Sequence, residues 1–456
     1  MLRHAHGLQP VGALLTLILT ESRATMLEKL FHLKQNNTTV QTEVVAGITT
    51  FLAMAYIVFV NPNILGTTGM DKGAVIVATC LAAALGCFIM AFWANWPVGM
   101  APGMGLNAFF AFTVVGAMGW TWQAALGAVF VSGCIFILLT VTGVRRWIVE
   151  SIPNSLQSAI PAGIGLFLAL IALKSAGIVV KNDATLVGLG NLHDPKVLLA
   201  ILGFLIIASL DFLKVKGAIL IGILSVTALS MLLGFSSFQG VVSTPPSIMP
   251  TFMQLDIMSA LSKGFFNVVL VLVLVEVFDA TGTLTGLAKR ANLLNANDNH
   301  KGLNRALFAD SVSIFGGSLL GTSSTTAYIE SMAGVQAGGR TGLTALVIGV
   351  LFLLALFFSP LIDAVPSYAT APALIYVAGL MLAELSHIEW SDITEAAPAA
   401  LTALVMPFTY SIANGLAFGF ISYTTLKLVT GRHKEVHPAA WVIAALFLVR
   451  FVWLPE

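Results

Sequence analysis

Charged residues are scarce in this sequence. Asp, Glu, Lys and Arg make up only 9% of its 456 residues, whereas about 25% are charged in an ordinary soluble domain. Because 57% of the residues are hydrophobic, a globular fold in water would have too little polar surface, which excludes a water-soluble protein. The net charge of +1 gives no reason to expect nucleic-acid or acidic partners. Lipid is therefore the expected solvent for most of the chain.

Cysteine is equally sparse, and its placement argues against metal chemistry. Cys80, Cys87 and Cys134 lie in apolar stretches without metal-ligand spacing, so we interpret them as small core residues. The sequence also has no HExxH motif and no nucleophile elbow. A membrane-embedded enzyme is thus disfavoured, and we expect no metal and no cofactor.

Long apolar runs, by contrast, are abundant. A membrane-spanning helix needs about 20 mostly apolar residues, and about fourteen such transmembrane segments fit between residues 45 and 429, with one more apolar segment at 437–453. Segments 98–117 and 323–337 are rich in Gly, Ser, Thr or Pro, which favours helices that break inside the membrane. We predict an all-α polytopic membrane protein.

The basic residues predict the orientation of these segments. With the N-terminus in the cytoplasm, 16 Lys and Arg residues, Arg145 among them, fall on the inside and five fall on the outside. Cytoplasmic loops carry such an excess in membrane proteins. Residues 1–25 loosely resemble a signal peptide, but we favour a spurious upstream extension, with Met26 opening an amphipathic segment at the cytoplasmic surface.

The two halves of the chain show a similar pattern. Tyr56 precedes Asn107 by 51 positions, and Asp279 precedes Glu330 by the same number. Such a pattern agrees with two inverted repeats of seven segments each, in which matching broken helices mark the binding site. The predicted parts are an N-terminal cytoplasmic segment (1–44), a first repeat (45–235), a linker (236–263), a second repeat (264–430) and a C-terminal segment that can form an extra helix (431–456).

Four polar residues stand where an apolar side chain would be cheaper. Glu276 and Asp279 lie in VLVLVLVEVFDATGTLTGL, Glu330 lies in GTSSTTAYIES, and Asn107 lies in APGMGLNAFFAF. A charged residue at the centre of a membrane helix costs about 2.5–3.5 kcal/mol on the insertion scale. An intramembrane carboxylate is therefore a candidate for substrate binding or proton transfer.

Each candidate also has a purely structural interpretation. Glu276 and Asp279 are three residues apart on one helix face, so that one can support the other. Glu330 can accept backbone N–H groups at a helix end, and Asn107 can cap a half-helix. We interpret Asp310 as a capping or solvated residue near a cytoplasmic helix end.

Five motifs in one order carry a specific resemblance. The segments TTFLAMAYIVFVNPNIL, APGMGLNAFFAF, FDATGTL, GTSSTTAYIES and GGRTGLTALVIG resemble the AzgA-like purine permeases of the nucleobase/cation symporter-2 family over nearly the whole chain. The resemblance implies 7+7 inverted repeats folded like the bacterial uracil permease, with core and gate domains. It implies a secondary active transporter in the bacterial inner membrane that imports adenine, guanine or hypoxanthine by proton symport. Relatives with this fold form dimers, so a homodimer is one expectation.

The resemblance also implies a site. The purine contacts of the family fall on Asn107, Asp279 and Glu330, and Gly105 matches a nearby glycine. Thr394 and Glu395 match as well, without an assigned role. FDATGT is similar to guanine/hypoxanthine members and GTSSTTAYIES to adenine members, so these motifs leave the preferred base open.

The residues themselves suggest how such a site works. An ionised carboxylate accepts two neighbouring N–H donors, and an Asn amide suits the mixed edge of a purine. Phe109 can stack on the ring or serve as packing. Because burial makes a carboxylate bind a proton more readily, Asp279, Glu330 and Glu276 are the candidates for proton coupling. An anion transporter of the same fold is the alternative, but such a site calls for a basic or neutral lining.

Overall fold

Helices form almost all of the secondary structure that the computed structural model describes. It describes residues 26–145, 148, 152–238, 240–264, 268–291, 293 and 301–453, and residues 1–25 lie outside this set. Within it, the only strands are two short antiparallel pairs, β1 with β4 and β2 with β3. The prediction of an all-α membrane fold is confirmed.

The first half of the chain runs from α2 to α10. Its helices and strands are α2 (Val40–Met54), α3 (Ile57–Gly66), α4 (Lys72–Ile89), the π-helix η1 (Met90–Ala94), β1 (Met100–Pro102), α5 (Met104–Ala108), the π-helix η2 (Phe109–Ala117), α6 (Trp122–Val141), α8 (Asn154–Ser175), β2 (Val179–Asn182), β3 (Leu186–Leu189), α9 (Pro195–Phe212) and α10 (Ala218–Leu232).

The second half contains the remaining elements. They are α11 (Ile257–Gly264), α12 (Leu270–Arg290), α13 (Lys301–Leu320), β4 (Thr325–Ala327), α14 (Ser331–Gln336), α15 (Gly342–Ala355), the 3-10 turn η4 (Leu356–Phe358), α16 (Ser359–Asp363), α17 (Ser367–Leu382), η5 (Ala383–His387), α18 (Ile393–Phe408), α19 (Ile412–Val429), η6 (His433–Glu435) and α20 (Pro438–Trp453). The expected linker 236–263 therefore contains most of a short helix, α11.

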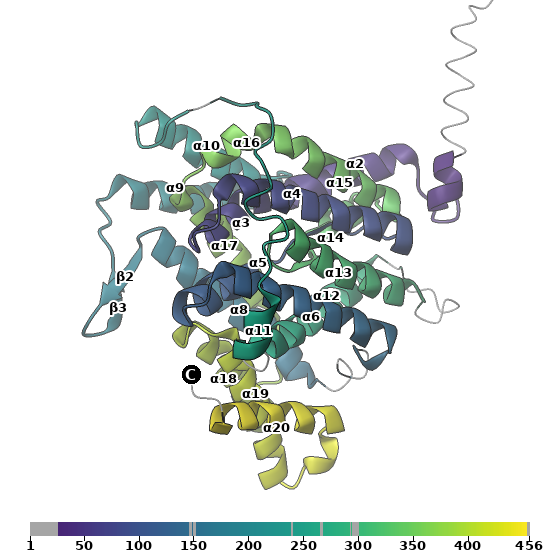
Figure 1. Cartoon of the computed structure of the whole chain (residues 1–456), viewed down its shortest axis with the longest axis vertical. Coiled ribbons are helices and arrows are strands. Elements are labelled where there is room, and N and C mark those ends of the chain that lie inside the picture. The colour runs from purple at the N-terminus through teal and green to yellow at the C-terminus, as the bar shows by residue number, and fades with distance from the viewer. Residues whose placement is uncertain are drawn as a thin grey trace, which may run out of the picture.

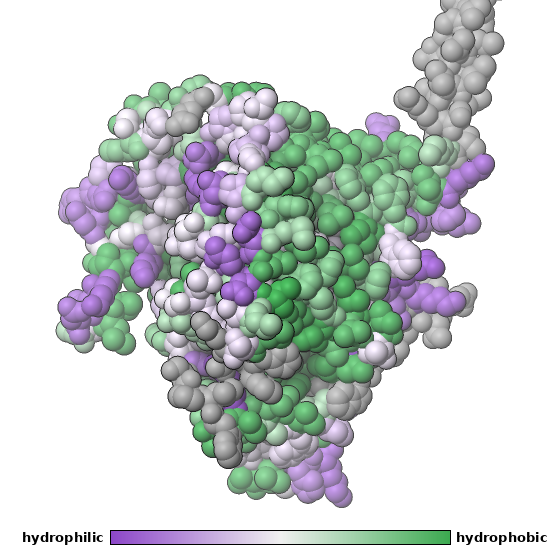
Figure 2. Space-filling model, viewed as in Figure 1, coloured by the Kyte–Doolittle hydropathy of each residue, from purple (hydrophilic) through white to green (hydrophobic). Residues whose placement is uncertain are grey.

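The surface and the helix lengths fit a bilayer. Among the described residues, nine helices are long and apolar enough to cross a membrane, and four shorter apolar helices accompany them, at 104–117, 218–232, 393–408 and 438–452. Figure 2 shows a broad apolar band between hydrophilic margins. The chain is a multi-pass membrane protein, and the count of fourteen segments stays a prediction.

The helices pack as two groups. In the first, which we call the core group, α15 packs on α2 and α4, and α13 packs on α4 and α6, with α12 beside α6 and α13. In the second, the gate group, α8 packs on α17 and α18, α17 packs on α9 and α10, and α18 packs on α19. Many of the long helices run in similar directions across Figure 1, and the β2–β3 hairpin projects from one end of them.

Both segments that the sequence marked as broken contain a short strand followed by a short helix. Segment 98–117 begins with β1 and continues as α5 and η2, and segment 323–337 begins with β4 and continues as α14. The two strands pair in antiparallel register, Met100 opposite Ala327 and Pro102 opposite Thr325. Each strand satisfies backbone groups that a broken helix would leave unpaired in an apolar interior. The pairing holds the starts of two short helices together at the centre of the core group.

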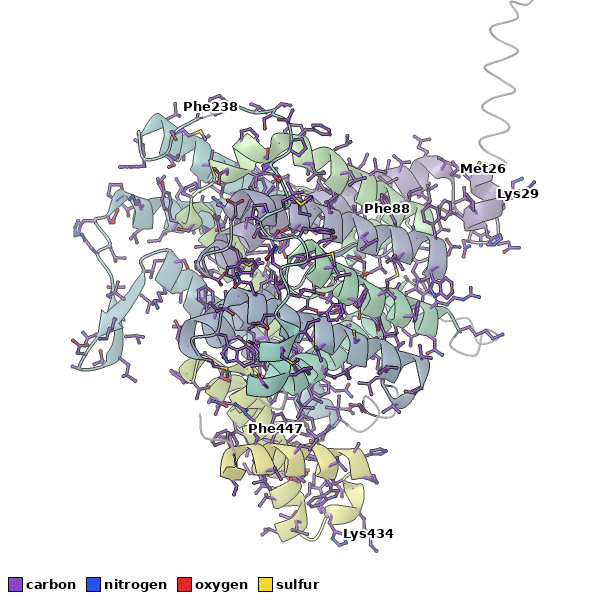
Figure 3. The ribbon with its side chains drawn as sticks, viewed as in Figure 1. Met26, Lys29, Phe88, Phe238, Lys434 and Phe447 are labelled. Carbon is purple, nitrogen blue, oxygen red and sulfur yellow. The ribbon has the colours of Figure 1, made fainter. Side chains whose placement is uncertain are left out.

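The C-terminal segment forms the extra helix that the sequence allowed. α20 packs against α19 through the ring pair Phe420 and Phe447, whose centroids are 6.5 Å apart. Figure 3 marks Phe447 where α20 meets the body of the protein and Lys434 at the outer corner of this segment. At the other end of the described chain, Asn95 donates a hydrogen bond of 3.1 Å to the carbonyl oxygen of Phe31, which fixes the N-terminal segment on the core group.

Candidate functional site

The β1–β4 pair brings Asn107 and Glu330 into one region. Asn107 is the fourth residue of α5, which starts directly after β1, and Glu330 is the residue that precedes α14, which follows β4. The backbone also ties the two segments together, since the N–H of Gly103 donates to the carbonyl oxygen of Ser324 over 2.8 Å. Two residues 223 positions apart in the sequence thus belong to one rigid crossing point.

Glu330 is held by a tyrosine from the first membrane segment. The hydroxyl of Tyr56 donates to Oε1 of Glu330 over 2.6 Å. Tyr56 is fully buried, and it lies at the break between α2 and α3. Glu330 itself is partly exposed. A carboxylate with one oxygen fixed and some surface accessible retains acceptor capacity for a ligand. Tyr56 entered the sequence analysis only through its spacing, and this contact was not foreseen.

Asn107 is fixed through its carbonyl and retains its amide donors. Its Oδ1 accepts a hydrogen bond from the hydroxyl of Ser323, and the residue is fully buried. Within the described part of the chain, its Nδ2 has no hydrogen-bond partner. Buried amides are ordinarily paired. The free donor is what a ligand with an acceptor edge would use.

α12 carries the two remaining predicted carboxylates. Glu276 is buried, and its Oε1 accepts from the hydroxyl of Ser132 on α6 over 3.3 Å. Asp279 is partly exposed, and its charge interacts with those of Glu330 and Asp310. The structure therefore brings Asp279 toward Glu330, and Glu276 lies near Ser324, Asp310 and Arg145 as well as Ser132. Their roles in binding and proton transfer stay predictions.

Gly105 lies where the core group meets the gate group. A Cβ atom at this position would lie 2.6 Å from Cγ2 of Ile164 on α8. Two carbon atoms pack at about 3.5–4.0 Å, so the close approach of α5 to α8 requires a glycine. This contact explains why the position is a glycine, and the part of Gly105 in substrate binding stays a prediction.

The helical twist separates Phe109 from Asn107. Two residues of an α-helix turn by about 200°, so Phe109 at the start of η2 points away from the Asn107 side, and it is fully buried. Phe110, three residues after Asn107, lies nearer to its face and is also buried. The alternative that Phe109 is packing fits this geometry, and stacking on a ligand stays a prediction.

Asp310 is not the solvated or capping residue that its sequence position suggested. It is fully buried, and its Oδ1 accepts from the hydroxyl of Thr326 over 3.2 Å and from the backbone N–H of Ala327 over 3.3 Å. Arg145, counted above among the cytoplasmic cations, is buried beside it, with 3.5 Å between Nη2 and Oδ2. Removing Arg145 from the count of inside charges leaves the excess intact. The interpretation of Asp310 was wrong because the chain folds this residue inward, and the orientation inferred from the basic residues stays a prediction.

Thr394 and Glu395 belong to a different cluster. The hydroxyl of Ser155 donates to Glu395 over 2.6 Å, and the ammonium of Lys427 lies 2.8 Å from the same carboxylate. Arg432 donates to the hydroxyl of Thr394 over 3.1 Å. These contacts tie α8, α18 and α19 together at one end of the gate group, which gives the pair a structural role.

Proteins similar to this chain in sequence are permeases. The sequence pattern described as "Permease family" matches residues 41–418. The chain is 49% identical to the adenine permease AdeP of Escherichia coli strain K12, covering 94% of this chain and 96% of that one. It is 44% identical to the guanine/hypoxanthine permease PbuO of Bacillus subtilis strain 168, over 92% and 99%.

Solved structures share the fold at low sequence identity. The transmembrane domain of the cyanobacterial bicarbonate transporter BicA superposes with a TM-score of 0.61 at 16% identity, covering 81% of this chain and 95% of that one. The structure of SLC26A9 gives a TM-score of 0.62 at 11% identity, over 90% and 70%. At such identities the similarity shows the fold alone.

Proposed function

The chain belongs to the permease family and is a transporter rather than an enzyme, and from this premise we propose that it imports purine nucleobases by proton symport. Adenine, guanine and hypoxanthine are the candidate substrates, since the relatives are named as permeases for adenine or for guanine and hypoxanthine. The observation that carries the proposal is the β1–β4 crossing, which brings Asn107, Glu330 and the acidic face of α12 together.

The hydrogen-bonding groups of this site suit a purine. A purine edge presents donors and acceptors in fixed positions, so a matching site needs both kinds of group in a dry place. Asn107 offers the donors of its amide, and the carboxylates of Asp279 and Glu330 accept from ring and exocyclic N–H groups. Tyr56 orients the Glu330 carboxylate before the substrate arrives, which lowers the ordering cost of binding.

The same carboxylates account for coupling to protons. An ionised group in an apolar interior is costly, and a proton removes that cost. If Asp279 or Glu330 binds a proton together with the substrate, the loaded core group crosses the apolar interior more easily than the empty, charged one. Glu276, buried beside them on α12, is the third candidate for this proton.

Movement between the core and gate groups would supply alternating access. We propose that they correspond to the core and gate domains of a 7+7 inverted repeat, with the repeats at 45–235 and 264–430. Among their contacts are Gly105 against Ile164 and the ring of Phe278 stacked on that of Phe420, with centroids 6.0 Å apart. Apolar contacts of this kind slide without breaking hydrogen bonds. The N-terminus is proposed to face the cytoplasm across the inner membrane, and a homodimer is one assembly of such chains.

Uptake into cells that lack their own purine permeases tests the proposal. Radiolabelled adenine, guanine, hypoxanthine and uracil are supplied with and without a protonophore. We expect uptake of at least one purine, little uracil uptake, and loss of accumulation when the protonophore is added. Asp279→Asn and Glu330→Gln should each lower purine uptake by about 100-fold, since each hydrogen bond to a charged group contributes about 1.5–3 kcal/mol.

The controls separate transport from expression and from the rival anion transporter. Each variant is quantified in the membrane fraction, and Asp363→Asn, on α16 and mostly exposed, should leave uptake unchanged. Bicarbonate and sulfate uptake are measured in the same cells. Anion uptake without purine uptake would replace the proposal with the alternative, and purine accumulation that survives the protonophore would remove the proton from it.

A further inference from the structure

Within the part of the chain that the structure describes, one buried cation contacts the acidic part of the core group. Among the described residues, Glu276, Asp279, Asp310 and Glu330 place four carboxyl groups around the β1–β4 pair, and the positive side chain that reaches one of them is Arg145. Its side chain is 2% exposed and that of Asp310 is 0% exposed. Charges this deep require partners, because an isolated buried ion costs many times the net value of an ordinary hydrogen bond.

Arg145 uses its whole guanidinium group to join three helices. It follows the end of α6, its Nε donates to the hydroxyl of Thr281 on α12 over 3.2 Å, and its Nη1 donates to the carbonyl oxygen of Leu307 on α13 over 3.0 Å. Its Nη2 reaches Asp310, and the guanidinium lies 4.1 Å above the ring of Phe136. This fork geometry is specific to arginine, because a lysine ammonium is a compact point charge that cannot span the same partners.

From Asp310 the contacts lead directly to the site. Its other oxygen holds the hydroxyl of Thr326 and the N–H of Ala327, both in β4, and Glu330 follows three residues later. On the other side, Thr281 is two residues beyond Asp279 in α12. Arg145 therefore connects the helix that carries one substrate carboxylate with the strand that positions the other.

We propose that Arg145 is a positioning residue for transport: it is the fixed countercharge that keeps Asp310 ionised, and Asp310 in turn fixes β4 and the Glu330 carboxylate. The charged groups facing this pair are Glu276 and Asp279 on α12. Without this positive charge the ionised Asp310 carboxylate has no countercharge, so the effect of removing Arg145 depends on pH.

Substitutions at Arg145 separate this role from simple packing. Arg145→Gln keeps polar contacts but removes the charge, and Arg145→Lys keeps the charge but not the fork. Arg340→Gln is the matched control, since the guanidinium of Arg340 in the core group donates to the carbonyl oxygens of Val335 and Gly339. Uptake of radiolabelled adenine and hypoxanthine is measured from pH 5.5 to 8 and normalised to protein in the membrane.

The expected results depend on charge and pH. Arg145→Gln should lower uptake by about 100-fold at pH 8, as expected when a buried ion pair loses one member. The loss should shrink to about 10-fold at pH 5.5, where a proton on Asp310 replaces the missing countercharge. Uptake by Arg145→Gln should therefore fall more steeply between pH 5.5 and pH 8 than uptake by wild type. Arg145→Lys should stay within about 10-fold of wild type at both pH values, and Arg340→Gln should show the pH dependence of wild type.

A second measurement does not require transport. Only the uptake measurement rests on the proposed function. The stability measurement compares the thermal midpoints of purified wild type, Arg145→Gln and Arg145→Gln/Asp310→Asn in detergent. The deficit of Arg145→Gln should be larger at pH 8 than at pH 5.5, and the double variant should regain much of it. A wild type that transports no purine would refute the proposed function but not this result. Equal deficits at both pH values, or an Arg145→Lys protein as inactive as Arg145→Gln, would overturn the countercharge role.

Discussion

The close approach at Gly105 allows a quantitative test of how the core and gate groups fit together. Adding one methyl group, Gly105→Ala, places a carbon 2.6 Å from Cγ2 of Ile164. Because ordinary carbon contacts lie at about 3.5–4.0 Å, α5 and α8 must separate by about 1 Å. Overpacking of this kind costs about 1–3 kcal/mol, and the better helix propensity of alanine returns at most about 1 kcal/mol.

The strain falls on the contact between the two groups and not within either of them. α5 belongs to the core group and α8 to the gate group, so each group can fold normally while the arrangement seen here becomes less populated. A cost of about 1–3 kcal/mol corresponds to about a 5- to 150-fold change in that population. We therefore expect Gly105→Ala to lower the rate of purine uptake by a factor in this range, with an unchanged amount of protein in the membrane.

A double-mutant cycle provides the decisive assay. Ile164→Ala removes the methyl group that the new Cβ meets, so Gly105→Ala/Ile164→Ala should transport better than the product of the two single effects predicts, with a coupling energy of at least about 1 kcal/mol. Gly379→Ala on α17, where an added Cβ meets nothing within 4 Å, should behave as wild type. Additive effects of the two substitutions, or normal uptake by Gly105→Ala alone, would refute the steric argument.

Three other substitutions probe contacts at and beyond the site. Tyr56→Phe removes the donor to Glu330 and should raise the KM for purine uptake by about 10- to 100-fold, since a hydrogen bond to a charged group contributes about 1.5–3 kcal/mol; an unchanged KM would show that the hydroxyl does not orient the carboxylate. Lys427→Met removes the cation from a cluster in which its own side chain is 1% exposed, and should lower the thermal midpoint of the purified protein more than Arg432→Ala, whose side chain is 40% exposed. Arg432→Ala should also act through pH: the guanidinium beside Glu435 lowers the pKa of that carboxyl to about 2, so its stabilisation is present above about pH 4.5 and is lost as the pH falls toward 2. The deficit of Arg432→Ala should therefore be larger at pH 6 than at pH 3, and a constant deficit would contradict this linkage.

Hydropathy and small-residue content predicted the parts of this fold that depend on local sequence. Apolar runs must be in lipid, and a run such as APGMGLN cannot remain a regular helix, so the breaks at 98–117 and 323–337 were foreseeable. Helix boundaries were less accurate. The second repeat was expected to begin at 264, whereas the long helix α12 begins at Leu270, because α11 extends to Gly264.

The contacts of the site could not be predicted in the same way. Tyr56 and Glu330 are 274 residues apart, and Arg145 and Asp310 are 165 apart. Distance from a predicted helix end places Asp310 and Arg145 near water, but the direction in which a side chain points depends on how α6, α12 and α13 cross. The number of basic residues near the end of a segment therefore does not tell whether a given side chain faces water or the protein interior.

The distribution of polar groups between the two halves of the chain limits what the site can bind. The first half supplies donors, namely the Tyr56 hydroxyl, the Asn107 amide and the Arg145 guanidinium, whereas the four carboxyl groups near β1 and β4 all come from the second half. Each half contributes one strand to the β1–β4 pair, but the polar side chains that the two halves place around it differ. A ligand held there must turn acceptors toward α5 and donors toward α12 and α14, which a simple anion cannot do and the mixed edge of a purine can. This asymmetry supports purine transport on a fold that the bicarbonate transporter BicA shares. It predicts that Asn107→Asp, which replaces the donor by a fifth carboxylate in this region, lowers purine uptake at neutral pH more than Asn107→Ser does.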